Sequence, residues 1–224
     1  MNMEDLYNKS MGLACAKIAH EIKNPIAIIA STLQLIEIQF PDVKKNKHWH
    51  KLYSELDFIS TLLNDFNKLS NSEDFDFALL DLGELISEVA DRFEPFAIQN
   101  QVELNLVLPD DIYNVNGDEI KLMEAFTNLL KNAVEAVSMC GRVLISLSIE
   151  GTYVVATVED NGSGIDEDKL SSIFLPFVSY KDNGTGLGLP IVASIINKHS
   201  GILDVISSLN NGTKFIIKLP LHPF

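Results

Sequence analysis

One histidine stands among side chains that can assist phosphoryl transfer. The run AHEIKNP occupies residues 19–25, so Glu21 follows His20 directly and Asn24 comes four residues later. A neutral imidazole nitrogen can attack a γ-phosphoryl group, and a carboxylate beside it can take the proton from the other ring nitrogen. On a helix Asn24 shares the face of His20, where its amide can instead position a water molecule. A lone helical histidine is usually just solvated, so this prediction depends on the rest of the chain.

A second set of polar residues lies in the run NLLKNAVEA at residues 128–136. Asn128 and Asn132 are four residues apart on a predicted helix, with Lys131 on the next face. An amide oxygen is a hard ligand suited to Mg²⁺, and an ammonium group neutralises phosphate charge. Taken alone, these residues are as well explained by helix capping or solvent exposure.

The run DNGSG at residues 160–164 follows a predicted apolar strand. Asp160 therefore stands at a strand end, followed by glycines that let a ligand approach the backbone closely. Its carboxylate can accept a hydrogen bond from the amino group of adenine. In isolation the same composition fits an Asx turn equally well or better.

Three alternate glycines open a further predicted helix in the run GTGLGL at residues 184–189. They leave backbone N–H groups free to meet phosphate at a helix N-terminus. The run is not a Walker sequence. The loop between Gly164 and Gly184 spans roughly 20 residues, a length that usually has a functional reason.

The histidine lies on the first of two predicted amphipathic helices. From about residue 7 to 38, apolar residues recur every three or four positions, and Pro25 is expected to bend the helix just after His20. Apolar residues then recur at coiled-coil spacing in a second helix after a short polar connection. A single helical hairpin leaves half of its apolar surface in water, so we expect two copies to pair in a four-helix bundle. The first stripe comprises Met11, Ala14, Ile18, Ile22, Ile29, Leu33 and Ile36, and the second Leu52, Leu56, Ile59, Leu63 and Phe66.

The polar run SNSED at residues 70–74 predicts a domain boundary, dividing the chain into residues 1–73 and 74–224. Beyond it, Asp81 and Asp118 are placed to cap helices that run to about Phe96 and Val137. Strands are expected at residues 102–108, 143–149, 153–158, 202–207 and 214–219, with a further helix ending near His199. This order predicts an α/β sandwich after the helical hairpin.

The composition and charge of the chain limit the classes of protein to which it can belong. Hydrophobic residues make up 46% of the chain and charged residues 21%, as in an ordinary globular protein. A formal net charge of −14 with no basic stripe argues against a nucleic-acid partner. No apolar run approaches the roughly 20 residues that span a bilayer, so we expect a cytoplasmic protein. Cys15 and Cys140 have no metal-site spacing, and we expect both to be buried free thiols.

The run AHEIKNP closely resembles the phospho-acceptor motif of the sensor histidine kinases of two-component systems. Four other runs then follow in the order of that family. NLLKNAVEA resembles its N box, DNGSG its first glycine box, FLPF at residues 174–177 its phenylalanine motif, and GTGLGL its second glycine box. The five together extend across nearly the whole chain, whereas each alone is a weak signal.

The resemblance implies roles for individual residues. His20 would carry the phosphoryl group, Glu21 would be the acid/base, and Asn24 would support dephosphorylation of a response regulator. Asn132 would ligate Mg²⁺, and Asp160 would select adenine. The loop before the second glycine box would be a mobile lid over ATP, although VSYK stands at residues 178–181 where a Thr-Thr-Lys run is common. The predicted nucleotide-binding positions are Asn128, Lys131, Asn132, Asp160, Gly162, Gly164, Lys181, Gly184, Thr185, Gly186, Leu187, Gly188 and Thr213.

The resemblance also implies the fold and the activity. We expect a dimeric helical hairpin followed by the ATPase fold shared with gyrase, chaperone and mismatch-repair ATPases, a mixed sheet with helices on one face. The expected activity is Mg²⁺- and ATP-dependent autophosphorylation of His20 and transfer to an aspartate of a response regulator. His48 and His50 lack a comparable motif and are expected to be solvated.

Three other functions are alternatives to histidine kinase activity. They are a phosphotransferase that has lost ATP binding, a nucleotide-gated scaffold, and an ATP-hydrolysing machine. The sequence leaves open the input signal, the regulator, the balance of kinase and phosphatase activity, and whether a chain phosphorylates itself or its partner.

Overall fold

The computed structural model describes residues 3–70, 75–109, 113–138, 140–181 and 184–222, with side chains from residue 19 onward except those of residues 20 and 70. Contacts divide the chain into two compact units. The hairpin unit comprises Met1–Glu73 together with Pro176–Leu187, and the sheet unit comprises Asp74–Leu175 together with Gly188–Phe224.

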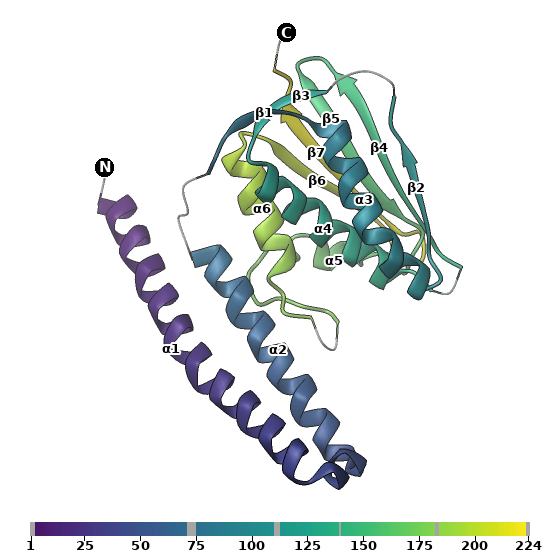
Figure 1. The fold of residues 1–224 in the computed structure, drawn as a ribbon. Coiled ribbons are helices and arrows are strands. Elements are labelled where there is room, and N and C mark those ends of the chain that lie inside the picture. The colour runs from purple at the N-terminus through teal and green to yellow at the C-terminus, as the bar shows by residue number, and fades with distance from the viewer. Residues whose placement is uncertain (1–2, 71–74, 110–112, 139, 182–183, 223–224) are drawn as a thin grey trace. The chain divides into compact units, whose positions relative to one another are not determined.

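The hairpin unit contains the two predicted helices. Helix α1 spans Met3–Gln39 and continues as a helix through Pro25, a 3₁₀ turn η1 covers Pro41–Lys45, and α2 spans Lys47–Ser70 (Figure 1). Ala19 and Ile26, seven residues apart on α1, are buried within the single chain. Ile22 and Ile29 of the predicted stripe are exposed, so apolar side chains of α1 face solvent in the described part of a single chain.

The turn of the hairpin is held by one polar cluster. Trp49 of α2 is buried and donates its indole N–H to Glu37 Oε1 of α1 over 2.6 Å. Lys44 Nζ lies 3.1 Å from Glu37 Oε2. The hydrogen bond from Trp49 is the main cause of a lowered pKa of Glu37, with Lys44 adding to it. His48 and His50, on either side of Trp49, are exposed as predicted.

The sheet unit is a two-layer sandwich built on a mixed sheet in the order β2-β4-β5-β7-β6. Strand β2 (Glu103–Val107) runs parallel to β4 (Arg142–Glu150). The other neighbours are antiparallel, and they comprise β5 (Tyr153–Asp160), β6 (Ile202–Ser207) and β7 (Thr213–Pro220). This arrangement confirms the mixed sheet and both hairpins expected from the sequence.

Helices cover one face of this sheet, as predicted (Figure 1). They are α3 (Leu82–Gln99), α4 (Glu119–Ala136) and α6 (Gly188–Lys198), with a short α5 (Glu167–Leu170). The predicted caps are present, because Asp81 Oδ1 accepts from Gly83 N over 2.8 Å and Asp118 Oδ1 accepts from Lys121 N over 3.0 Å. Along α4 the buried apolar side chains recur with helical spacing, from Leu122 to Val134, and leave the opposite face polar.

A small second sheet was not predicted. Strand β1 (Ala78–Asp81) pairs antiparallel with β3 (Asn114–Gly117), so the chain is anchored as it enters the sheet unit. The prediction that Cys140 is buried is wrong, because the thiol is exposed in the turn between α4 and β4, where the backbone of Cys140 has a φ of 64°. The side chain of Cys15 lies outside the described residues.

Among the described residues, no helix combines the length and the apolar character that a bilayer span requires. The cytoplasmic location stays a prediction.

Candidate functional site

Asp160 is the most enclosed charged residue among the predicted site residues. It ends β5 with only 6% of its surface exposed, and its Oδ1 accepts from Gly162 N over 2.8 Å. This bond is the Asx turn that the sequence allowed, so the turn and a ligand-binding role occur at the same place. Directly across the pairing of β5 with β7 lies Thr213, which is 5% exposed.

Three glycines let separate segments approach one another around Asp160. A Cβ at Gly162 would overlap the carbonyl of Ala136 at the end of α4. A Cβ at Gly164 would overlap the carbonyl of Ser208, and one at Gly212 would overlap the carbonyl of Asp160 itself. Gly164 and Gly212 have φ values of 67° and 79°, which favour glycine. The first glycine box is thereby packed between the end of α4 and the β6–β7 turn.

Ser207 is a member of this site that the sequence analysis missed. Its hydroxyl oxygen lies 2.9 Å from Thr213 Oγ1, and its hydroxyl donates to Gly212 O over 2.9 Å. It also accepts from Ile165 N over 2.8 Å, just after the first glycine box. Ser207 therefore joins the two loops that flank Asp160. The role of Ser207 follows only from the strand register that places Ser207 opposite Thr213. That register depends on the pairing of β6 with β7, which cannot be read from the sequence.

The exposed face of α4 carries the predicted N box. Asn128 and Asn132 are both partly exposed and lie one turn apart, and Lys131 is exposed with its Nζ 4.0 Å from Glu135 Oε1. A Cβ added at Gly188, the first residue of α6, would meet Asn128 Oδ1 at 3.8 Å. The start of α6 thus lies beside the N box, so two predicted nucleotide-binding motifs meet within the sheet unit.

The segment that leads to α6 forms a tight loop in the hairpin unit. Phe177 N donates to Gly186 O over 3.0 Å, and a Cβ at Gly186, where φ is 67°, would meet Val178 N at 2.7 Å. Leu187 N donates to Thr185 Oγ1 over 3.3 Å, and Leu187 is fully buried. Gly184 N donates to Lys181 O over 3.2 Å. Gly184 and Gly186 of the predicted phosphate-binding run therefore take part in hydrogen bonds within this loop.

The predicted phosphoryl acceptor lies on α1. His20 is within this helix, and its side chain, predicted to face water, lies outside the described residues. Glu21 and Asn24 are exposed. Lys23 of the same turn donates to Asn64 Oδ1 of α2 over 3.1 Å, which fixes this turn against the second helix.

The described residues contain no cluster of three or more histidine, cysteine or acidic ligands. Asn128 and Asn132, both partly exposed and one turn apart on α4, offer amide oxygens, hard ligands that suit a Mg²⁺ ion taking most of its ligands from water and phosphate.

The two halves of the chain each match a known domain family. Residues 10–75 match the His Kinase A (phospho-acceptor) domain, and residues 117–223 match the histidine kinase-, DNA gyrase B- and HSP90-like ATPase domain. This chain belongs to the sensor histidine kinases. Sporulation kinase C of Bacillus subtilis (strain 168) is 34% identical over 92% of this chain and 48% of its own length. The chain spans about half or less of the length of the curated relatives it matches first.

Solved histidine kinase structures have the same fold. The full-length ShkA structure in complex with AMPPNP has a TM-score of 0.79 and 25% identity, over 96% of this chain and 47% of that one. The histidine kinase ThkA in complex with the response regulator protein TrrA has a TM-score of 0.70 and 28% identity. That similarity covers 95% of this chain and 62% of the other. The family similarity predicted from the five motifs is confirmed.

Proposed function

We propose that this chain binds Mg²⁺-ATP, phosphorylates His20 and passes the phosphoryl group to an aspartate of a response regulator. The observation that carries the proposal is the enclosed Asp160 with three close-packed glycines, in one chain with the phospho-acceptor run on α1. We assign residues 1–73 to dimerisation and phosphotransfer and residues 74–224 to ATP binding.

In the proposed nucleotide site, Asp160 accepts a hydrogen bond from the amino group of adenine, and Thr213 lies beside the same base. Support comes from the burial of both side chains and their opposed positions on β5 and β7. Asn128 and Lys131 contact the phosphates or the ribose. Lys181 and the backbone of residues 184–188 contact the phosphates, where a helix N-terminus favours negative charge.

In the proposed transfer step, one imidazole nitrogen of His20 attacks the γ-phosphorus, and the bond to the bridging oxygen of ADP breaks. Glu21 takes the proton from the other ring nitrogen, so the phosphorylated ring is neutral. The Asn132 amide oxygen is the side-chain ligand that α4 would offer to a Mg²⁺ ion bound with ATP, and that ion would neutralise phosphate charge. Most of the rate then comes from positioning of the nucleotide and the histidine.

We propose a homodimer formed through the hairpin. Large apolar side chains remain exposed on both helices of the single chain, and a second copy is the partner that buries them in a four-helix bundle. The exposed set comprises Ile22, Ile28, Ile29, Leu35, Ile38, Leu52 and Ile59.

We propose a response regulator receiver domain as the second partner, because the related ThkA has been solved with a protein of that kind. Asn24 is exposed on α1 and is assigned to dephosphorylation of the regulator, where its amide would position the attacking water.

The test is incubation with Mg²⁺ and γ-labelled ATP, with the label examined for acid lability. We expect acid-labile, base-stable label that His20→Gln and Asn132→Ala abolish. His48→Gln, which removes an exposed histidine of α2, is the matched control and should leave labelling unchanged. ATP binding without any label would overturn the kinase proposal in favour of a nucleotide-gated scaffold, and release of phosphate without labelled protein would favour an ATP-hydrolysing machine.

A further inference from the structure

One carboxylate in the sheet unit receives hydrogen bonds from two different segments. Asp118 Oδ1 accepts from Lys121 N in the first turn of α4 over 3.0 Å, and its Oδ2 accepts from Asp76 N over 3.0 Å. Residues 75–77, which we call the lead-in segment, are the described residues by which the chain enters the sheet unit. Asp118, which is 7% exposed, therefore joins the lead-in segment to the start of α4.

The backbone of the same residue is held by His199, immediately after α6. Asp118 N donates to His199 Nε2 over 2.9 Å, and His199 Nδ1 lies 2.8 Å from Ile195 O. Because Nε2 accepts, the ring carries its proton on Nδ1 and donates it to Ile195 O. His199 is 5% exposed, and in its neutral form both nitrogens are satisfied.

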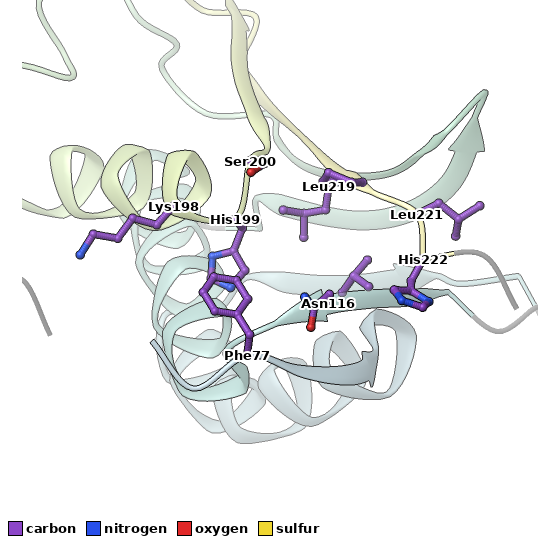
Figure 2. A pocket seen from close by; sticks show the side chains of 10 residues that line it. Phe77, Asn116, Lys198, His199, Ser200, Leu219, Leu221 and His222 are labelled. Atoms are coloured by element: carbon purple, nitrogen blue, oxygen red, sulfur yellow. The ribbon is translucent and has the colours of Figure 1, made fainter. Parts of the chain in front are cut away.

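The lead-in segment also packs directly on this histidine. The rings of Phe75 and Phe77 lie 5.5 and 5.0 Å from the imidazole ring, measured between centroids. Lys198 Nζ sits 4.5 Å from the centroid of Phe75. Figure 2 shows Phe77 against His199 at a cavity of about 520 Å³, whose lining includes Asn116 and His222. His199 is itself one of the residues that line this cavity.

The packing leaves little space beside the imidazole. A Cβ at Gly117 would lie 3.1 Å from His199 Cδ2 and 2.7 Å from Leu122 Cδ1. The ring therefore cannot move far in the direction of Gly117 to relieve a mismatch.

We propose that His199 is a positioning residue that ties the lead-in segment to both helices of the nucleotide site, and that protonation of its ring releases this tie. The inference rests on the proposed function, because α4 carries Asn128 and Asn132 and α6 begins at Gly188. When Nε2 gains a proton, two N–H groups face each other between His199 and Asp118. Asp118 must then move, and its bonds to Asp76 and Lys121 weaken with it.

The surroundings of His199 favour the neutral ring. Burial lowers the pKa of His199, and this effect outweighs the bond to Ile195 and the charge of Asp118, both of which act to raise it. The nearby charged or titratable groups are Asp118 at the start of α4, Lys121 within it, Asp76 in the lead-in segment, Lys198 on α6 and His222 after β7. Release is therefore expected in mildly acidic solution, below the ordinary histidine value of about 6.5.

The test compares the whole 224-residue chain with His199→Gln and His199→Leu. Glutamine keeps an acceptor for Asp118 N but does not titrate, whereas leucine fills the space without an acceptor. The control His222→Gln removes the exposed histidine that also lines the cavity. For each protein, NMR measures amide hydrogen exchange at Asp76 and Asp118, and calorimetry measures ADP affinity, at about pH 8 and about pH 5. In the parent and His222→Gln, NMR also gives the tautomer of His199.

At the higher pH we expect the Nδ1–H tautomer of His199 in the parent. Both amides should exchange slowly in the parent, His199→Gln and His222→Gln, and fast in His199→Leu. The leucine variant should bind ADP roughly 5- to 10-fold more weakly. At the lower pH, protection of the two amides, taken as the measured exchange rate relative to the intrinsic rate at that pH, should fall in the parent and in His222→Gln but not in His199→Gln.

Equal protection of the Asp76 amide in the parent and His199→Leu would overturn the inference, as would an equal loss of protection at the lower pH in the parent and His199→Gln. If His199→Leu does not fold, the comparison of the parent with His199→Gln still decides. If the parent shows the expected exchange pattern but binds no ADP, the proposed function is contradicted, whereas the proposed role of His199 in holding the lead-in segment is supported.

Discussion

Asp160 and Thr213 face each other across β5 and β7, at the end of β5 that leads into the first glycine box. Ser207 faces Thr213 from β6 and touches it by a hydrogen bond of 2.9 Å between the hydroxyl oxygens. Three neighbouring strands therefore contribute one polar side chain each to the same end of the sheet. Since Asp160 is buried, a ligand that reaches it must be recognised by specific hydrogen bonds rather than by general charge attraction.

Asp160→Asn should weaken ATP and ADP binding without unfolding the chain. The asparagine oxygen can still accept from Gly162 N, but the new NH₂ group opposes the adenine amino group. We expect roughly 10- to 100-fold weaker binding, the cost of leaving buried polar groups unpaired. Calorimetric titration measures the affinity, and a circular dichroism melt checks the fold.

The matched control is Asp168→Asn on α5, which removes an exposed carboxylate of the sheet unit. Equal affinities for the parent and Asp160→Asn would show that Asp160 serves only the turn.

Gly212→Ala should destabilise the sheet unit because it combines a left-handed backbone with a steric overlap. The new Cβ would collide with the carbonyl of Asp160, and φ at this position is 79°. We expect a loss of about 2–4 kcal/mol in the free energy of unfolding. Chemical denaturation followed by far-UV circular dichroism measures it.

Gly151→Ala separates the two causes. Gly151 also has a positive φ, of 61°, but no atom lies within 4 Å of the added Cβ. This variant should lose only about 1 kcal/mol. Equal losses at the two glycines would mean that the approach of the β6–β7 turn to Asp160 contributes nothing to stability.

The stability of the sheet unit should fall as the pH falls toward and below about 6.5. The pKa of His199 is lowered in the folded state, so the unfolded chain takes up this proton first and gains relative stability. The stabilisation is fully present above the ordinary histidine value and is lost as the pH falls through the folded value. Thermal melts across this range should show a smaller decline for His199→Gln than for the parent, whereas parallel curves would assign the decline to other groups.

The sequence predicted the elements that carry their own local signals. Asp81 and Asp118 predict the starts of α3 and α4, and alternating apolar residues predict β4 and β5. These signals can be read because helix caps and strand periodicity involve only a few neighbouring residues. It missed β1 and β3, whose four-residue strands have too little length for a pattern and pair across more than 30 positions. Ser207 and His199 were missed for the same reason, since their partners are set by tertiary contacts.

The burial of Cys140 was wrongly predicted from its apolar neighbours, because a turn between α4 and β4 exposes it. The boundary at residues 73 and 74 and the roles of His20, Glu21 and Asn24 stay predictions. The roles of the nucleotide-binding residues stay predictions as well.

Asn132→Ala should make nucleotide binding less sensitive to Mg²⁺. If the amide oxygen ligates the ion, its loss weakens binding of Mg²⁺-ATP but leaves metal-free ATP nearly unaffected, because phosphate and adenine contacts persist. We expect a roughly 10-fold loss with Mg²⁺ and less than about 2-fold with a chelator present. Asn197→Ala, an exposed asparagine on α6, is the control and should bind like the parent in both conditions. Equal weakening with and without the metal would instead give Asn132 a direct contact to the nucleotide, and Mg²⁺ would then take its ligands from phosphate and water alone.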